Sequence, residues 1–575
     1  MSADFKTTLI KDSRLADITD ELDYAVMSGA SSNTYQQFNA ISTSSSSMVF
    51  NIQVPSESVC VSREVLLQSS VYFTINITAV PVGIQSFNYG STDALQAFPL
   101  NSLFTTLSSQ INNTNVSVNL QDVLPQLLRL NNNRELYKYN GMTPSLPDQA
   151  YKAYADGVGA TNNPLAAYGT ASYDGDLLPR GQYPIVIDSF VHNIAAGGSD
   201  ASPISTDLAD TWVIQAHINV TEPLMGLSPF IFGDSEYNKQ ALVGINAMNF
   251  VMNIDTTCKR FWSTASPYTY SVSLGSTFSQ NPFPDARMLL NFLSTQPTDL
   301  IQARNVVPYM DFPRYLSLQS SVGVVNAGNT ATLNSQNIQI NQLPDYFIVC
   351  VRKPMSQQTI KDSSSFFRIN SISVNLNNTS GLLSSSTAQD LWRISQSNCS
   401  EQSWAEFSGS AIKVDNASGQ GSSIYTTGSL LILSPAKDLS LPDYLSSGSI
   451  GQYNFQFQVS ATNISGENIT PEICVICVNS GLFTTIAGSS NIYTGILTKQ
   501  MVLDAKTNEE SVDPVSSAQY KRLVGGKMGD MALTAVKKMP FVRDVVRKLK
   551  KFAGAGVPSG AGVASGAGRL DALCG

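Results

Sequence analysis

The chain has 575 residues, of which 42% are hydrophobic and only 14% charged, and its formal net charge is −8. This length predicts more than one domain, and the charged fraction is well below the roughly 25% of an ordinary soluble domain. The polar first residues predict no secretory signal, and no apolar run is long enough to span a membrane. The seven scattered cysteines are typical of a protein made inside a cell with free thiols.

Most of the chain before residue 505 shows the two-residue period of β-strands. Apolar residues alternate with polar ones, which predicts strands with one buried face and one wetter face. Residues 346–351 are apolar throughout and predict a strand covered on both sides, whereas the clearest helical pattern spans residues 120–130. The alternating runs are Phe50–Val54, Val71–Ile77, Trp212–Val220, Phe250–Ile254, Ile338–Ile340, Ile372–Leu376 and Tyr453–Val459.

These strand runs form two groups, at about residues 45–235 and 248–505, each long enough for an eight-stranded sandwich. Many strands with few helices predict an all-β protein built from sandwiches. The long polar stretches 131–180 and 377–425 predict functional or structured insertions. The predicted organisation is an N-terminal arm (1–44), a first sandwich (45–240), a second sandwich (241–505), a polar linker (506–526) and a basic tail (527–575).

Motifs of enzyme chemistry are missing from the sequence. We find no nucleophile elbow, phosphate loop or zinc-binding His-Glu motif, so we expect neither an enzyme nor a cofactor or metal site. His217 is one of only two histidines, with His192, and lies on the polar face of an alternating run. Cys474 and Cys477 have redox-like spacing, but residues three apart in a strand point to opposite faces, so we predict two buried structural thiols.

Several segments, in this order along the chain, resemble the major capsid proteins of virophages (Sputnik-like and mavirus-like) and of the related Polinton-like viruses. Together they cover most of residues 90–460. No single segment is diagnostic, and their shared order carries the resemblance. The segments are Asp93–Leu100, Tyr151–Asp156, Asn162–Leu165, Leu178–Gly181, Glu222–Leu224, Ser228–Phe230, Ala247–Phe250, Arg260–Trp262 and Trp404–Phe407.

The resemblance implies a double jelly roll, with two eight-stranded antiparallel sandwiches in one chain and long inserted loops. It further implies three chains in a pseudo-hexagonal capsomer, a lattice of such capsomers with a penton or vertex capsid protein, and an icosahedral shell around double-stranded DNA. The expected location is the virion, assembled inside the host cell at cytoplasmic virus factories. Residues 131–180 and 377–425 are the candidates for the outward loops of the family.

A Gly-Gly pair lies at the boundary between the linker and the tail. Leu523-Val524-Gly525-Gly526-Lys527 resembles the cleavage consensus of adenovirus-type cysteine proteases, which cut after two glycines. Glycines suit a narrow protease cleft because a Cβ atom would clash there. We therefore predict processing after Gly526 by a viral cysteine protease, with a flexible hinge as the alternative.

Charge is concentrated in the tail. From Lys521 onward the sequence carries a net charge of about +8, which leaves about −16 on the rest. An apolar stripe at helical spacing opposes a basic face, so an amphipathic helix is predicted before a Gly/Ala-rich end. Three interpretations stay open: docking on a neighbouring capsid subunit, contact with DNA or lipid, and a passive solvated appendage. The basic face consists of Arg543, Arg547, Lys548, Lys550 and Lys551.

The leading hypothesis is therefore a self-assembling capsid protein that forms homotrimers and then a lattice. A β-sandwich protein that binds a receptor or glycan, such as a fibre, is the alternative, since aromatic residues in the segment Tyr168–Tyr173 could stack on a ligand. A removable basic tail has no role in that alternative. A β-rich hydrolase would need an acid/base pair that the sequence does not display.

Overall fold

A computed structural model describes most of the chain up to residue 495. The two strands 6–11 and 23–28 are described, as are residues 31–81, 93–130, 184–193, 209–230, 241–264, 268–295, 304–362, 364–414, 421–439 and 445–495, with residues 89, 136 and 441. Most of the predicted insertion 131–180 and the whole of the predicted linker and tail lie outside these residues.

The first sandwich packs a six-stranded sheet against a five-stranded sheet, and all strand pairs are antiparallel. The six-stranded sheet contains β3 (Ser31–Asn39), β6 (Cys60–Pro81), β10 (Val186–Asn193), β11 (Ala209–Pro223), β14 (Thr269–Leu274) and β15 (Arg287–Thr295). The five-stranded sheet contains β4 (Ser42–Thr43), β5 (Ser47–Gln53), β8 (Phe104–Ile111), β9 (Thr114–Val118) and β12 (Ala247–Ile254).

The second sandwich has the same composition of sheets. Its six-stranded sheet, called the shared sheet below, contains β16 (Arg304–Asp311), β17 (Arg314–Leu318), β20 (Tyr346–Arg352), β25 (Leu431–Leu433), β27 (Glu472–Ile486) and β28 (Ser489–Thr494). Its five-stranded sheet contains β18 (Thr330–Asn334), β19 (Ile338–Gln342), β21 (Arg368–Leu376), β22 (Thr379–Leu382) and β26 (Ile450–Thr462).

Three two-stranded sheets and a few short helices complete the described chain. The small sheets are β1 (Lys6–Lys11) with β2 (Asp23–Ser28), β7 (Asp93–Leu95) with β13 (Trp262–Thr264), and β23 (Ser410–Val414) with β24 (Gly421–Tyr425). The helices are α2 (Pro99–Leu103), α3 (Leu120–Leu130), η3 (Met355–Gln357), α6 (Ala388–Ser397), α7 (Trp404–Phe407) and α8 (Pro435–Asp438).

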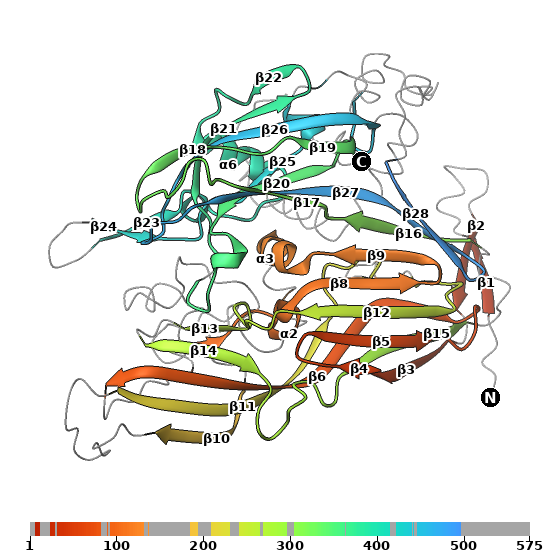
Figure 1. The fold of residues 1–575 in the computed structure, drawn as a ribbon. Coiled ribbons are helices and arrows are strands. Elements are labelled where there is room, and N and C mark those ends of the chain that lie inside the picture. Colours follow the sequence, from red (N-terminus) through yellow and green to blue (C-terminus); the bar gives the residue numbers. More distant parts are fainter. Residues whose placement is uncertain are drawn as a thin grey trace, which may run out of the picture.

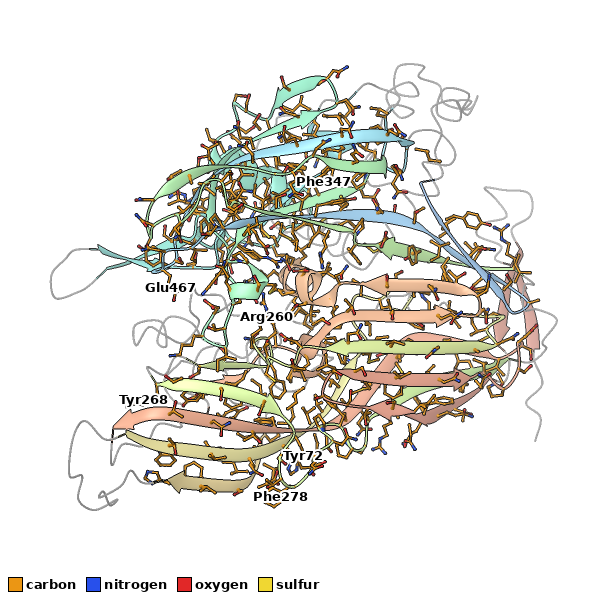
Figure 2. All side chains as sticks on the ribbon, in the orientation of Figure 1. Tyr72, Arg260, Tyr268, Phe278, Phe347 and Glu467 are labelled. Atoms are coloured by element: carbon orange, nitrogen blue, oxygen red, sulfur yellow. The ribbon has the colours of Figure 1, made fainter. Side chains whose placement is uncertain are left out.

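The two sandwiches are stacked on each other, with α3 of the first one lying between them (Figure 1). The shared sheet of the second sandwich faces this helix and the first sandwich. Side chains fill both sandwiches, with Phe347 inside the second and Arg260 in the region between the two (Figure 2).

Local sequence patterns account for these elements. In β26 every second residue from Tyr453 to Ala461 is buried, as the alternation of apolar and polar residues predicts. In β20 all residues after Tyr346 are buried, which confirms the prediction of a strand covered on both sides. The predicted helix 120–130 is confirmed as α3 with the same bounds.

Two predicted domain boundaries do not follow the strand pairing. Strand β3 starts at Ser31, inside the predicted N-terminal arm, and pairs with β15. Strands β12, β14 and β15 lie beyond the predicted division at residue 240, yet they pair with β5, β6 and β8 of the first sandwich. The chain thus completes the first sandwich only at Thr295. Alternation along a sequence reveals a strand but not its partner, which explains the difference.

The predicted insertion 377–425 is a structured segment. It carries β22, α6, α7 and the hairpin of β23 and β24. Both helices begin with a capping box, in which two side chains each accept a hydrogen bond from the other residue's backbone N–H group. The pair is Thr387 and Asp390 in α6, and Ser403 and Glu406 in α7. This segment packs on the second sandwich, where α6 contributes Leu391 and α7 contributes Phe407 to the apolar core.

We expect Gly428→Ala to destabilise the second sandwich strongly. Gly428 has a φ of +84°, and a Cβ atom there would lie 2.0 Å from the carbonyl oxygen of Phe366. Gly448 has a φ of +82° with no atom near the Cβ position. Gly448→Ala therefore measures the free energy lost by placing a Cβ on a left-handed backbone, without any steric clash. In urea unfolding we expect a loss of about 1 kcal/mol for Gly448→Ala and about 3 kcal/mol or more for Gly428→Ala. Equal losses would contradict this packing.

Candidate functional site

The residues predicted to be processed or to bind a partner lie outside the described part of the chain. These are the cleavage motif around Leu523, Gly525, Gly526 and Lys527, and the basic face of the tail. The structure therefore neither brings them together nor separates them. The described residues instead show how the two sandwiches are joined, and which surface they leave exposed.

The two histidines lie on adjacent strands of the outer sheet of the first sandwich, His192 on β10 and His217 on β11, towards opposite ends of the strand pair. The Nδ1 atom of His217 lies 2.9 Å from both carboxylate oxygens of Asp188, and its ring stacks on Tyr72. His192 stacks on Trp212 with 4.2 Å between the ring centroids. A carboxylate and aromatic rings orient these imidazoles but supply no nucleophile, so the contacts fit a structural role.

Along β20, β25 and the first half of β27, both faces of the shared sheet are apolar and buried. Towards the first sandwich it presents a row that belongs to the same apolar cluster as the first core, including Ile348, Cys350, Ile432, Cys474 and Ile476. Towards the second core it presents the alternate residues Phe347, Val349, Val351, Leu431, Leu433, Ile473, Val475 and Cys477. One sheet thus closes two hydrophobic cores.

The two cysteines with redox-like spacing confirm this arrangement. Cys474 faces the first core and Cys477 faces the second, as predicted for residues three apart in a strand. Burial raises the pKa of the Cys477 thiol well above its ordinary value. These two sulfurs therefore lie on opposite sides of one strand.

A buried ionic cluster joins α3 of the first sandwich to the shared sheet of the second. The Arg352 guanidinium, 2% exposed, donates through one terminal nitrogen to Asp122 of α3. Its Nε donates to Glu472 of β27 over 2.9 Å. The Nε of Arg314 lies 2.5 Å from the other carboxylate oxygen of Asp122. Burial alone lowers the pKa of Arg352, but the neighbouring thiols and carboxylates outweigh it and raise that pKa above its ordinary value.

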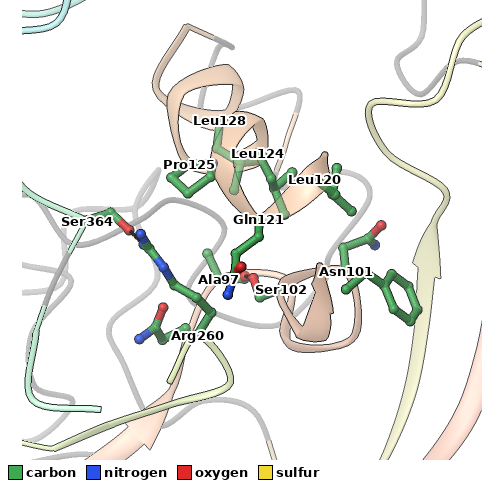
Figure 3. A pocket seen from close by; sticks show the side chains of 12 residues that line it. Ala97, Asn101, Ser102, Leu120, Gln121, Leu124, Pro125, Leu128, Arg260 and Ser364 are labelled. Carbon is green, nitrogen blue, oxygen red and sulfur yellow. Dashed lines mark hydrogen bonds between the residues drawn. The ribbon is translucent and has the colours of Figure 1, made fainter. Parts of the chain in front are cut away.

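A second contact between the sandwiches centres on Ser364. The guanidinium groups of Arg260 and Arg129 donate to its hydroxyl and its carbonyl oxygen, respectively. Beside them is a cavity of about 20 Å³, bordered by α2, α3 and Arg260 (Figure 3). This volume holds about one water molecule. Burial lowers the pKa of Arg260 to about 10, so the group stays charged at neutral pH.

A buried carboxylate fixes the short helix α2 that borders this cavity. Glu222, at the end of β11, accepts hydrogen bonds from the backbone N–H groups of Leu100 and Asn101 and from the Asn101 side chain. Burial raises the pKa of Glu222 to about 7, although these hydrogen bonds oppose the shift. Glu222 therefore ties a segment of the first sheet to the helix beneath the second sandwich.

Strand β10 is the most apolar exposed element in the described part of the chain. It ends its sheet, with β11 as its only partner among the described strands. Val186, Ile187, Phe190 and Val191 are 44–47% exposed, although they occupy a single eight-residue strand. An apolar edge strand of this kind is typical of a surface that contacts another protein.

The described residues contain neither a candidate metal site nor a helix that could span a membrane. Among them no group of three or more His, Cys, Asp or Glu side chains could hold a metal ion. The helices described in the structure are all too short or too polar to cross a membrane.

Sequence patterns missed the charged residues that join the sandwiches, although a signal was present. Arg352 directly follows the apolar run 346–351, and Glu472 directly precedes the apolar run 473–478. Asp122 lies within the amphipathic helix and is buried. A charge beside or inside a buried segment predicts a buried partner. Only the three-dimensional structure shows which charges pair.

We expect Asp122→Asn to destabilise the protein by about 3–5 kcal/mol, because it leaves the buried Arg352 without half of its counter-charge. Glu467→Gln is the matched control. It removes a carboxylate that pairs with Lys353 from a side chain 41% exposed, and we expect a loss within about 1 kcal/mol. Urea unfolding of both variants at neutral pH measures the difference. Losses of the same size would show that the buried cluster does not hold the sandwiches together.

Comparison with known proteins agrees with this architecture. Two family models match the chain in succession: the first domain of the Sputnik virophage major capsid protein over residues 3–293, and the C-terminal domain of major capsid protein V20 over residues 312–481. The V20 protein of Sputnik virophage is 27% identical over 524 residues, which covers 89% of this chain and 82% of that protein.

Two solved structures share the fold. The cryo-EM structure of the Sputnik virophage contains a chain that is 24% identical, with a TM-score of 0.71 over 89% of this chain and 98% of that one. The crystal structure of the mavirus major capsid protein is 16% identical, with a TM-score of 0.59 over 83% and 93% of the two chains. The stacked sandwiches are thus two jelly rolls, as the sequence resemblance implied. The first family model covers just over half of the chain, and on this basis the protein belongs to the Sputnik/mavirus family of virophage major capsid proteins, which are structural proteins of the virion.

Proposed function

We propose that this protein forms homotrimeric, pseudo-hexagonal capsomers that tile the icosahedral shell of a double-stranded DNA virus. The observation that carries the proposal is the pair of jelly rolls closed by one shared sheet. Three copies of a two-sandwich chain place six similar sandwiches around a threefold axis. Such a ring approximates sixfold symmetry, which is the symmetry of a hexagonal lattice position.

The shared sheet suits this role because it makes the two sandwiches one rigid unit. Relative motion would break the apolar contacts of Ile348 and Ile476 with the first core and the ion pair between Arg352 and Asp122. A pre-organised unit loses less conformational freedom when it joins a lattice. The exposed apolar strand β10 supports a contact with another capsid subunit.

The tail belongs to a separate part of the proposal. Residues 506–526 form a linker, and a viral cysteine protease cuts after Gly526. The basic residues from 527 onward act before cleavage, through a neighbouring subunit, DNA or lipid. A penton protein closes the vertices, and assembly takes place at cytoplasmic virus factories. The sequence supports this proposal for the tail, because a polar linker, a Gly-Gly motif and a basic segment follow one another along the chain.

We expect the full-length protein to be a trimer in solution. Light scattering should give three times the 61.9 kDa of one chain, and electron microscopy should show pseudo-hexagonal particles. Val191→Lys places a charge on β10 and should lower the trimer fraction at least several-fold. Val324→Lys, at another exposed valine, is the matched control and should leave it unchanged.

Two outcomes would count against this assignment in different ways. A protein that stays monomeric under all salt conditions would reject the homotrimer. A stable trimer that tolerates Val191→Lys as well as Val324→Lys would reject β10 as its contact and leave the homotrimer standing.

We expect the chain in mature particles to end at Gly526. Intact-mass measurement of particles should show the loss of residues 527–575. Gly526→Val should preserve the full-length chain, because a Cβ atom blocks the narrow protease cleft. Gly560→Val, within the Gly/Ala-rich end, is the control and should be processed normally. A full-length chain in wild-type particles would reject the cleavage.

A further inference from the structure

Two free thiols lie directly opposite each other in the shared sheet. Cys350 of β20 pairs in register with Cys474 of the antiparallel strand β27. Both side chains are completely buried, and both face the first sandwich. In the architecture described so far, both cysteines serve only as buried apolar side chains.

The register brings these cysteines within bonding reach. Residues directly opposite in an antiparallel pair have Cα atoms about 4.5–5.5 Å apart, which falls inside the range of about 4.4–6.8 Å that disulfides require. Both sulfurs lie on the same side of the sheet, and each one shifts the pKa of the other. The two side chains leave the same face of adjacent strands, so a covalent bond between them requires only local adjustment of the side chains and backbone.

The surroundings favour the thiolate form of Cys350. The hydrogen bond from Cys474 and the positive charge of Arg352 lower the pKa of Cys350 and outweigh its burial. The side-chain amide of Gln126, on α3, also donates to its sulfur, over 3.8 Å. The other buried thiols differ, because burial raises the pKa of Cys258 to about 12 and that of Cys399 to about 11. A thiolate beside a second thiol can be converted to a disulfide by a peroxide once local opening admits the oxidant.

We propose that Cys350 and Cys474 form a cross-strand disulfide when the folded protein meets a peroxide oxidant. The Cys350 thiolate attacks one peroxide oxygen, the O–O bond breaks, and the sulfenic acid and hydroxide form. The Cys474 sulfur then attacks the oxidised sulfur and gives up its proton, and the sulfenic oxygen leaves as water. Overall, two thiols and one hydrogen peroxide yield one disulfide and two waters.

The position of this bond gives it a structural consequence. It would tie together the two central strands that close both hydrophobic cores. Thiols stay reduced inside a cell, whereas disulfides persist on virion surfaces and outside cells. The cross-link would thus form after release and strengthen the chain when it no longer needs to fold. Because both sulfurs are buried, we expect the reaction to be slow and limited by local opening.

Peptide mapping of the wild-type, full-length protein tests the proposal. The folded protein is incubated with hydrogen peroxide, then unfolded and alkylated with N-ethylmaleimide. We expect two fewer alkylated cysteines and a peptide pair joined through Cys350 and Cys474, which reduction separates. Because no Lys or Arg separates Cys474 from Cys477, fragmentation of this peptide must show that Cys477 is alkylated. No cross-link, a cross-link to another cysteine, or a sulfinic acid at Cys350 would overturn the proposal.

Variants separate this pair from the remaining thiols. Cys477→Ser lies on the same strand but faces the other core, so it should retain the cross-link. Cys474→Ala should abolish it. Oxidation should raise the thermal midpoint of the wild type and of Cys477→Ser by several degrees, and leave that of Cys474→Ala unchanged. If Cys474→Ala does not fold, the wild-type peptide map still decides. A cross-link without a rise in midpoint would reject the stabilising role.

Discussion

The shared sheet must be covered on both faces, and the rest of the structure depends on this requirement. Strands β20 and β27 present apolar side chains on both sides, so neither sandwich alone could bury them. Each fully buried aliphatic or aromatic side chain contributes about 1.5–3 kcal/mol relative to exposure. Separating the jelly rolls would expose a row of such residues, including Ile348, Ile432 and Ile476. The chain therefore contains two sandwiches but only one packed unit.

Buried charges specify how the two sandwiches meet. An apolar contact alone tolerates sliding, since hydrophobic burial has no preferred direction. The Arg352 guanidinium bonds to Asp122 of the first sandwich and Glu472 of the second at the same time, so sliding one sandwich on the other would break the pair with Asp122. Burying these ions costs free energy, and such pairs add little net stability. Because these contacts are directional, they favour the observed position of α3 on the shared sheet.

Short-range patterns in the sequence predicted individual strands and the helix α3, but not which strands and side chains pair with one another. The apolar run 346–351, the helix 120–130 and the opposite faces of Cys474 and Cys477 follow from periodicity alone. The predicted division at residue 240 does not follow the strand pairing, because β12 and β15 pair with strands that precede them by many residues. The same limit applies to Arg352, whose buried position is local but whose partner Asp122 is not. The family resemblance supplied the long-range order that periodicity lacks.

A shared sheet changes which interactions determine the geometry of a lattice. If the two jelly rolls were joined by a linker only, contacts between subunits would have to fix their relative angle, at a cost in conformational freedom. Here that angle is already set by the apolar faces of β20 and β27 and by the ion pairs of Arg352. Contacts between chains then need to specify only how whole units meet. If the proposed contact through the exposed strand β10 is weak and reversible, errors in assembly can be corrected without changing the angle between the two jelly rolls of one chain.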